Sequence, residues 1–342
     1  MSDIEYLSRI LISGDGMPSL PAGEMEACLG LAHKHHVVVR WLRKLLANPS
    51  EEVAKTALPA LAEEEARIAN ALEFLERICD ELNAEGCETV VIKSLDHWPD
   101  LGSDLDLYSN GAAGEILRTM KARFGAEVAA RSWGDRLAGK WNFNLPGLPE
   151  AVEVHVGRLG QTGEHVDWAH GIPQRAERVR KGRHTFPVTS AEDRLMISTL
   201  QRMYRHFYFR LCDVVDSADL VESGYVDFAR LRKHSEAAGI WKGVASYLAI
   251  VSDYVETYRG KPVPLPPAVR AASSFGGERL SFNRGFLRIP IVPHSVALYT
   301  AELGTLARKG EVMETIRLSL LPYLAAAAAV GQKITGSDKG IW

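Results

Sequence analysis

The chain of 342 residues lacks the short motifs of several large enzyme classes. It contains no GxSxG, GxxxxGK[ST], GxGxxG or HExxH segment, so a serine hydrolase, a P-loop kinase, a Rossmann dinucleotide enzyme and a zinc protease all lack support. The four cysteines have neither CxxC spacing nor paired histidines at zinc-finger intervals. We therefore expect reduced cysteines and no zinc site, as in a cytoplasmic protein.

Long apolar runs are also missing. The most apolar late stretch, LLPYLAAAAAVG at 320–331, is too short and too rich in alanine to span a bilayer and is expected to be a packed helix. The N-terminal MSDIEYLSRI carries acidic residues where a signal peptide would be basic. We expect a cytoplasmic location and no membrane partner. With a net charge of −3 the whole chain is not built to bind nucleic acid, although a local basic face remains open.

Composition and periodicity indicate a globular protein of two packed units. Apolar residues make up 46% and charged residues 24% of the chain, which suffices for a core without disulfides or metal. Helical periodicity covers residues 4–86, strand patterns with one helix follow, and helices dominate the rest. We therefore expect an α+β fold: an N-terminal helical extension (1–60), a core with a small mixed β-sheet flanked by helices (61–188), and a mainly α-helical C-terminal lobe (189–342).

The local patterns predict individual elements. Strands are expected at 89–93, 105–108, 127–133, 140–145 and 152–156. Helices are expected at 25–47, 62–83, 115–124, 191–212, 214–223, 228–238, 241–259 and 311–330.

The segment 90–108, VVIKSLDHWPDLGSDLDLY, carries the sharpest chemical pattern in the chain. Because strand side chains alternate faces, Asp104 and Asp106 point to one side while the leucines beside them face the core. Two adjacent carboxylates suit a divalent cation such as Mg²⁺, which is usually held by one or two carboxylates plus substrate phosphates. Glu153, in the alternating strand VEVHV, would add a third carboxylate, and three can hold two Mg²⁺ ions.

A solvated strand face, on which each acid pairs with an arginine, is the alternative interpretation. It does not explain the Gly102-Ser103 turn directly before Asp104, which lets a phosphate approach the backbone closely. His155 shares the face of Glu153 and fits a hydrogen-bonded structural residue better than a ligand.

The order of these motifs resembles the nucleotidyltransferase fold of the DNA polymerase β superfamily, and more closely the bacterial group called uncharacterised nucleotidyltransferases. In that group an LKG strand end precedes DIDLLV, a vDlHw strand adds the third acid, and vlspeD and H…rllD segments follow. The matching stretches here are IKS at 92–94, DLDL at 104–107, EVHV at 153–156, PVTSAED at 187–193, and RH with FRLCD within 205–213. The resemblance covers about residues 60–260, with gaps.

The resemblance implies a polymerase β-like core and a function. The protein would move NMP from an NTP such as ATP to an acceptor hydroxyl, with Mg²⁺ or Mn²⁺, and release pyrophosphate. Asp104 and Asp106 would ligate the metal, and Glu153 would complete the site and take the acceptor's proton.

Phosphate contacts are expected from two places. Lys93, Ser94 and Ser103 would contact the triphosphate if the resemblance holds. In RMYRHFYFR at 202–210, Arg202 or Arg205 would add charge to the triphosphate, whereas helical spacing puts Arg210 about 80° from Arg202. Packing of this aromatic helix on the core is the other interpretation.

Two further clusters are expected to be solvated surfaces. The basic run RAERVRKGR at 175–183 has the composition of an exposed face, with tRNA contact as the minority interpretation. The cluster HKHH at 33–36 has no carboxylate or cysteine at ligand spacing, so a surface helix face is expected there rather than a metal site.

Two departures from the group motivate a second hypothesis. Ser94 stands where the group has glycine, and DLGS at 100–103 replaces a usual arginine. The chain could therefore be a non-catalytic nucleotidyltransferase-like protein that binds a nucleotide or a partner. Against this stands the acid triad, because close like charges disfavour each other's ionised form without a ligand. The mildly acidic net charge favours a small-molecule acceptor; a tRNA 3′ end or a protein side chain also fits, and the oligomeric state stays open.

Overall fold

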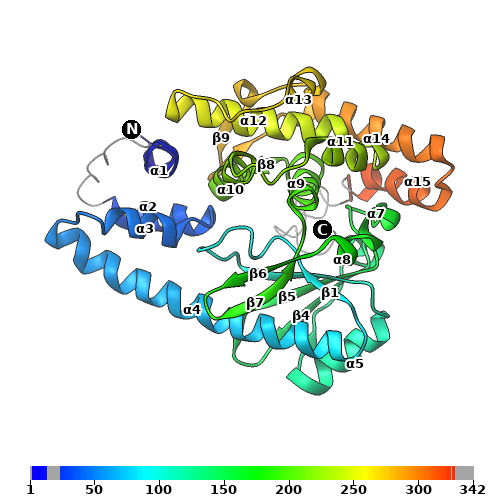
Figure 1. The fold of residues 1–342 in the computed structure, drawn as a ribbon, viewed down its shortest axis with the longest axis horizontal. Helices are drawn as coiled ribbons and strands as arrows, with labels where there is room; N and C mark the ends of the chain where they lie inside the picture. The colour runs from blue at the N-terminus through cyan, green and yellow to red at the C-terminus, as the bar shows by residue number, and fades with distance from the viewer. Residues whose placement is uncertain (1, 14–23, 325, 328–342) are drawn as a thin grey trace.

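The computed structural model describes residues 2–13, 24–324, 326 and 327. It contains a seven-stranded mixed sheet, a three-stranded sheet and a large helical region (Figure 1), so the predicted α+β class is confirmed. Among the described residues, each helix is too short or too polar to span a lipid bilayer.

The elements, in chain order, have the following bounds. The strands are β1 (Thr89–Val91), β2 (Asp104–Ser109), β3 (Glu127–Val128), β4 (Lys140–Leu145), β5 (Leu148–Val156), β6 (Glu177–Lys181), β7 (His184–Val188), β8 (Tyr208–Phe209), β9 (Ser281–Asn283) and β10 (Phe286–Arg288). The α-helices are α1 (Asp3–Ile12), α2 (Met25–Lys34), α3 (Val38–Leu45), α4 (Glu51–Ala84), α5 (Ala113–Phe124), α6 (Trp133–Leu137), α7 (Val166–His170), α8 (Ile172–Arg175), α9 (Ala191–Thr199), α10 (Leu211–Glu222), α11 (Phe228–Ala237), α12 (Trp241–Arg259), α13 (Pro267–Ala272), α14 (Val296–Lys309) and α15 (Val312–Ser319). Short helices of other types are η1 (Leu200–His206), η2 (Gly277–Arg279) and η3 (Ile291–Ser295).

The main sheet places β2 at its centre. The strand order is β3-β4-β5-β2-β1-β7-β6, with β2 parallel to β5, β1 parallel to β7 and the other pairs antiparallel. Leu105 and Leu107 of β2 are fully buried and pack in one core with α4 and α5, which lie below the sheet in Figure 1. Because strand side chains alternate, burial of the leucines turns Asp104 and Asp106 to the opposite face.

The helices on the other side of the sheet form a second core. Buried residues of α9 to α12 and α14 pack there together with α1, α2 and α3. The long helix α4 contributes Ala57 to this second core and residues from Ile68 onward to the sheet's core, so it connects the two. Most of the buried apolar residues described before residue 60 therefore share their core with the lobe that begins at 189.

The predicted helix over 191–212 is wrong in its second half. It continues past α9 as the π-helical turn η1 and ends at His206, because Phe207 takes a left-handed conformation (φ 56°). The chain then forms β8, which pairs with β10 about 80 residues later in the sequence. A partner so distant in sequence could not be read from local periodicity.

Other boundaries also differ from prediction. The strand predicted at 127–133 stops at Val128, because Ser132 caps the short helix α6. The helix predicted at 25–47 is two helices, separated near His36, whose φ is 52°. The basic run at 175–183 contains the edge strand β6. The helix predicted at 311–330 is interrupted: α15 ends at Ser319, a turn at Leu320 precedes the helical residues 321–324, and residues 328–330 lie outside the described residues.

A buried His165–Glu302 pair joins the loop after β5 to α14 and predicts a pH-dependent stability. The Nε2 atom of His165 lies 3.0 Å from Glu302 Oε1, with Glu164 Oε1 at 3.8 Å, and all three side chains are buried. Burial raises the pKa of Glu302 to about 7. Burial alone would lower the pKa of His165, but Glu302, Glu164 and Glu311 raise it.

Both folded-state pKa values exceed the unfolded values, so the folded protein holds these protons longer and its stability falls as pH rises through about 7. The cost should be on the order of 2 kcal/mol between pH 5 and pH 8, and Glu302→Gln should remove most of it. Urea unfolding at several pH values checks this, with the exposed Glu256→Gln as control. Equal pH dependence in wild type and Glu302→Gln would contradict the assignment.

Candidate active site

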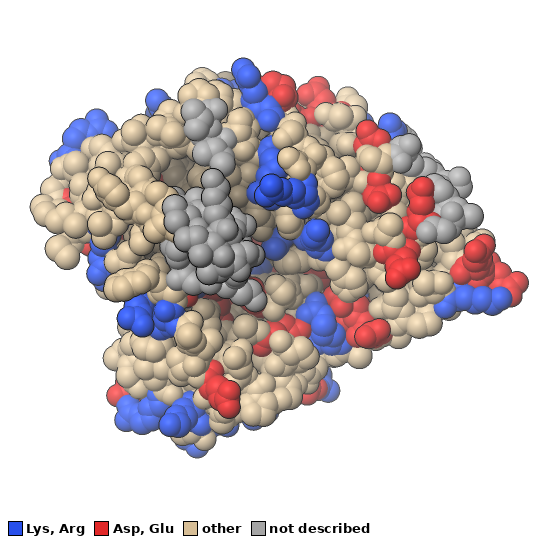
Figure 2. Space-filling model, turned by 180° about the vertical axis from the view of Figure 1, so that it is seen from behind, with Lys and Arg blue, Asp and Glu red and all other residues tan. Residues whose placement is uncertain are grey.

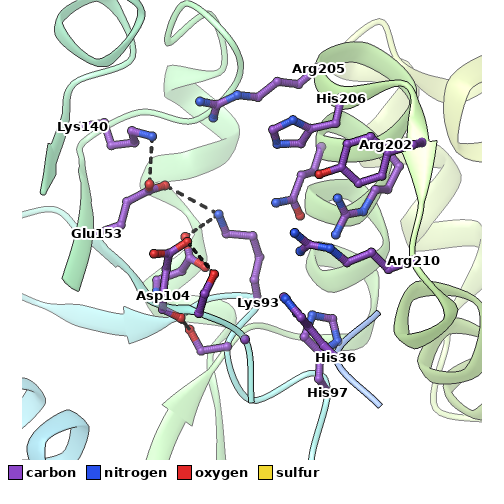
Figure 3. Close-up of a pocket in the computed structure, with 16 residues that line it drawn as sticks. His36, Lys93, His97, Asp104, Lys140, Glu153, Arg202, Arg205, His206 and Arg210 are labelled. Atoms are coloured by element: carbon purple, nitrogen blue, oxygen red, sulfur yellow. Dashed lines mark hydrogen bonds and ion pairs between the residues drawn. The ribbon is translucent and has the colours of Figure 1, made fainter. Parts of the chain in front are cut away.

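A polar cavity of about 250 Å³ lies between the acid-bearing face of the main sheet and the helical lobe (Figure 3). One wall comes from the loop after β1 and from β2, β4 and β5; the opposite wall comes from η1, β8 and the residue before α10. The structure brings all eight predicted site residues to this cavity, namely Lys93, Ser94, Ser103, Asp104, Asp106, Glu153, Arg202 and Arg205.

The acidic wall is made by two adjacent parallel strands. Asp106 of β2 and Glu153 of β5 are direct register partners. A carboxylate oxygen from each and a nitrogen of His155 lie within 4.8 Å of one another, which is close enough for one cation to reach all three. Asp104 lies two residues earlier on β2 and is the more exposed of the two aspartates. The predicted pair of aspartates and the third acid are thus on one face, with Asp106 and Glu153 the closer pair.

Two lysines and a histidine hold the acids in place. Lys93 Nζ lies 2.5 Å from Asp106 Oδ1 and 3.7 Å from Glu153 Oε1. Lys140 Nζ lies 2.8 Å from Glu153 Oε2, and His155 Nε2–H donates to Glu153 Oε1 at 2.8 Å. The hydrogen-bonded role expected for His155 is therefore what the structure has.

These contacts give the three carboxyl groups different pKa values. Burial disfavours the ionised form of Glu153, but Lys93, His155 and Lys140 together hold its pKa well below the usual value. Burial raises the pKa of Asp106 to about 7 against the pull of Lys93, with the charge of Glu153 adding to the rise. Burial and the charge of Glu153 also raise the pKa of Asp104. A cation at this wall would favour the ionised form of both aspartates.

Ser94, which stands at the position of a glycine in the group that the chain resembles, supports the acidic wall through hydrogen bonds to β2. Its side chain is buried, accepts the N–H of Asp106 at 2.7 Å and donates to the carbonyl of Asp104 at 3.3 Å. Lys93 before it has φ 61°, a left-handed conformation that turns the chain here. On the other side, Arg67 of α4 donates to the carbonyls of Leu101 and Gly102 and fixes the loop before Asp104.

This geometry predicts a stability cost for Ser94→Ala. The substitution removes the acceptor for a backbone N–H in a buried site, so the free energy of unfolding should fall by about 1–3 kcal/mol. Ser94→Gly, which restores the residue of the group, should cost at least as much. Urea denaturation measures both. Ser103→Ala is the control, since its hydroxyl is exposed and 3.4 Å from Asp104 Oδ2. An equal loss in Ser103→Ala and Ser94→Ala would contradict the role given to Ser94.

The opposite wall is basic. Arg202 is 1% exposed and its Nε lies 2.7 Å from Asp213 Oδ2, so its charge is already paired. Arg205 and Arg210 are only partly buried, and no carboxylate of the described residues forms an ion pair with either. Of the two predicted arginines, Arg205 is thus the one with charge available to a ligand. Figure 3 shows Arg205 and Arg210 on the side of the cavity opposite Glu153.

The expectation that helical spacing keeps Arg210 apart from Arg202 and Arg205 is wrong, because all three line the cavity. It assumed one continuous helix, whereas the chain leaves the helix at Phe207 and Arg210 follows β8. Lys140, His36 and His97 also line the cavity and were not predicted as site residues. Lys140 lies opposite His155 in the β4–β5 pair and reaches Glu153 two residues away, and the alternating pattern of 140–145 was the available signal for it.

The outer surface adds no large single-charge face in the view of Figure 2. Lys and Arg side chains are interspersed there with Asp and Glu among the residues coloured in that view. No protein-family model and no curated protein matches the chain.

Proposed function

We propose that this protein is a metal-dependent nucleotidyltransferase with a polymerase β-like core, which moves NMP from an NTP to an acceptor hydroxyl and releases pyrophosphate. The observation that carries the proposal is the opposition of two walls across one cavity, carboxylates of β2 and β5 on one side and Arg205 and Arg210 on the other. A metal–triphosphate complex needs both kinds of partner, because the cation takes oxygen ligands and the phosphates take guanidinium donors.

The donor set fits Mg²⁺ or Mn²⁺. Asp104, Asp106 and Glu153 offer hard oxygen atoms, and all three line the cavity rather than the core. These carboxylates would hold the metal, with Lys93 turning from Asp106 towards the phosphates. When bound, the metal would polarise a phosphoryl oxygen and neutralise developing negative charge.

The protein's own residues would position the reactants. Lys93, His155 and Lys140 hold Glu153 ionised, which suits it to bind a cation beside Asp106, although its lowered pKa makes it a weak acceptor for the proton of the acceptor hydroxyl. Arg205 and Arg210 would bind phosphate oxygens. A second cavity of about 640 Å³ shares His36 and the Gly102-Ser103 turn with the first and has room for the nucleoside or the acceptor.

One observation favours a second candidate function, nucleotide binding without catalysis. Lys93 and Lys140 already pair with Asp106 and Glu153, whereas Arg205 and Arg210 form no ion pair among the described residues. In that case a polyphosphate would bind to the basic groups without any divalent ion.

One experiment separates the two. The full chain is incubated with each α-labelled NTP, Mg²⁺ or Mn²⁺ and a cell extract, and the label is measured in the small-molecule, RNA and protein fractions. Transfer of label supports the transferase and gives the acceptor class. Absence of transfer from every NTP contradicts it. Thermal stabilisation by an NTP in the presence of chelator, without transfer, would instead establish the non-catalytic function.

A further inference from the structure

A second group of metal-ligand side chains lies at the edge of the cavity, away from the acidic wall. His36 and His97 line the cavity, and Cys212 is fully buried behind them. One ligand atom from each of the three lies within 4.8 Å of the others. Figure 3 shows His36 and His97 side by side near Arg210, on the far side of Lys93 from Glu153. The three residues come from the turn after α2, the loop after β1 and the first turn of α10.

We propose that His36, His97 and Cys212 form a binding site for a zinc-class transition-metal ion. Two imidazoles and a thiolate are the donors that Zn²⁺ prefers, and three protein ligands leave a fourth position of a tetrahedral site open. Because His36 and His97 line the cavity, that position faces the cavity, where a water or a substrate oxygen would fill it. Binding would release the thiol proton of Cys212 to solvent.

The geometry of His97 is that of a metal-binding histidine. Its Nδ1–H donates to Asp216 Oδ2 at 2.6 Å, so Nε2 is the nitrogen that faces Cys212 and that would bind the metal in the neutral imidazole. The distance from this Nε2 to Cys212 Sγ is 3.8 Å. Zn–N and Zn–S bonds at a tetrahedral angle require about 3.5 Å between the two atoms. A carboxylate that orients a ligating imidazole in this way is the usual support of a zinc ligand.

The side chain of His36 has no hydrogen-bond partner among the described residues. Its Nδ1 is buried and unpaired among the described residues, and its backbone is in the left-handed region at φ 52°. The preceding His35 fixes this strained turn: it accepts the N–H of Leu211 at 2.8 Å, and its carbonyl accepts the N–H of Cys212 at 3.3 Å. The turn thus carries His36 to the start of α10, where one of its ring nitrogens lies within 4.8 Å of the ligand atoms of His97 and Cys212. A buried imidazole nitrogen without a hydrogen-bond partner is consistent with a ligand at this place.

The Arg40 guanidinium connects the segments that carry the three proposed ligands. Arg40 bonds Asp100 at 2.8 Å and Asp216 at 2.6 Å, so it connects α3, the loop after β1 and α10. Each of these elements adjoins one of the proposed ligands. The network therefore preorganises three ligands that lie 61 and 115 residues apart along the chain.

Titration of the chelator-treated full chain with Co²⁺ alone tests the proposal. Tetrahedral Co²⁺ bound by a thiolate gives a sulfur-to-metal charge-transfer band and intense visible bands, which carboxylate sites do not give. We expect one equivalent of Co²⁺ with this band, its displacement by Zn²⁺, loss of the band in Cys212→Ser and at least tenfold weaker binding in His36→Gln.

Matched variants keep the test specific. Cys28→Ser removes another buried thiol and His33→Gln an exposed imidazole, and both should bind Co²⁺ like wild type. Asp106→Asn should also retain the band, which separates this site from the acidic wall. A wild-type chain without the charge-transfer band, in which Cys212 and His97 are only an internal polar pair, would overturn the proposal. So would a band that persists in Cys212→Ser.

Discussion

The double variant Asp104→Asn, Asp106→Asn is expected to lower the rate of NMP transfer by about 10³-fold, which corresponds to about 4 kcal/mol of transition-state stabilisation. Both side chains would lose the charge that holds a divalent cation, while their size and their place on β2 stay the same. The rate of pyrophosphate release under saturating NTP and Mg²⁺ measures the effect, with the acceptor fraction identified by label transfer.

Two measurements guard this prediction against a folding defect. The variant Asp80→Asn, Glu88→Gln makes the same change in net charge at two exposed positions and should transfer NMP at the wild-type rate. The double aspartate variant should also keep its thermal unfolding transition, since Lys93 can still approach Glu153. Transfer within threefold of wild type by the folded double variant would show that these aspartates are not metal ligands.

The part of the site that lies on strands could be predicted from the sequence. Alternation alone places Asp104 and Asp106 on one face, and VEVHV places Glu153 and His155 together on another strand. The structure makes these strands parallel neighbours in which Asp106 is opposite Glu153. Period-two patterns are informative because the buried leucines and valines fix which face is turned outward.

The part of the site built by turns could not be predicted in the same way. His36 and Phe207 both adopt left-handed conformations, and each ends a helix that periodicity would continue. Those two turns bring His36 next to Cys212 and Arg210 to the cavity. The pairing of β8 with β10 and the bonds from His35 to α10 are long-range contacts, and they determine these positions more than local propensity does. The three ligands of the proposed zinc-class site are far apart in the sequence and form no recognisable motif. The absence of CxxC spacing therefore led to the expectation that the chain has no zinc site.

Arg40→Met is expected to lower the free energy of unfolding by about 3–5 kcal/mol, because it leaves the buried Asp100 without its cation and Asp216 with His97 alone. Arg40 Nε lies 2.8 Å from Asp100, whose side chain is 1% exposed, and Nη1 lies 2.6 Å from Asp216. Burial opposes the ionised form of Asp216, but Arg40 and His97 keep its pKa below the usual value. Methionine fills the space of the side chain and supplies no charge. Urea denaturation in chelator-treated buffer measures the loss.

Arg43→Met provides the comparison within the same helix. Arg43 pairs with Glu65 at 2.8 Å, but both side chains are about half exposed, so the substitution should cost less than about 1 kcal/mol. The two variants therefore remove one arginine each from α3 and differ in the burial of the acids left behind. Because Arg40 also connects the segments that carry His36, His97 and Cys212, Arg40→Met should weaken Co²⁺ binding as well, whereas Arg43→Met should not. Equal destabilisation by the two substitutions would mean that the buried network contributes no more than a surface ion pair.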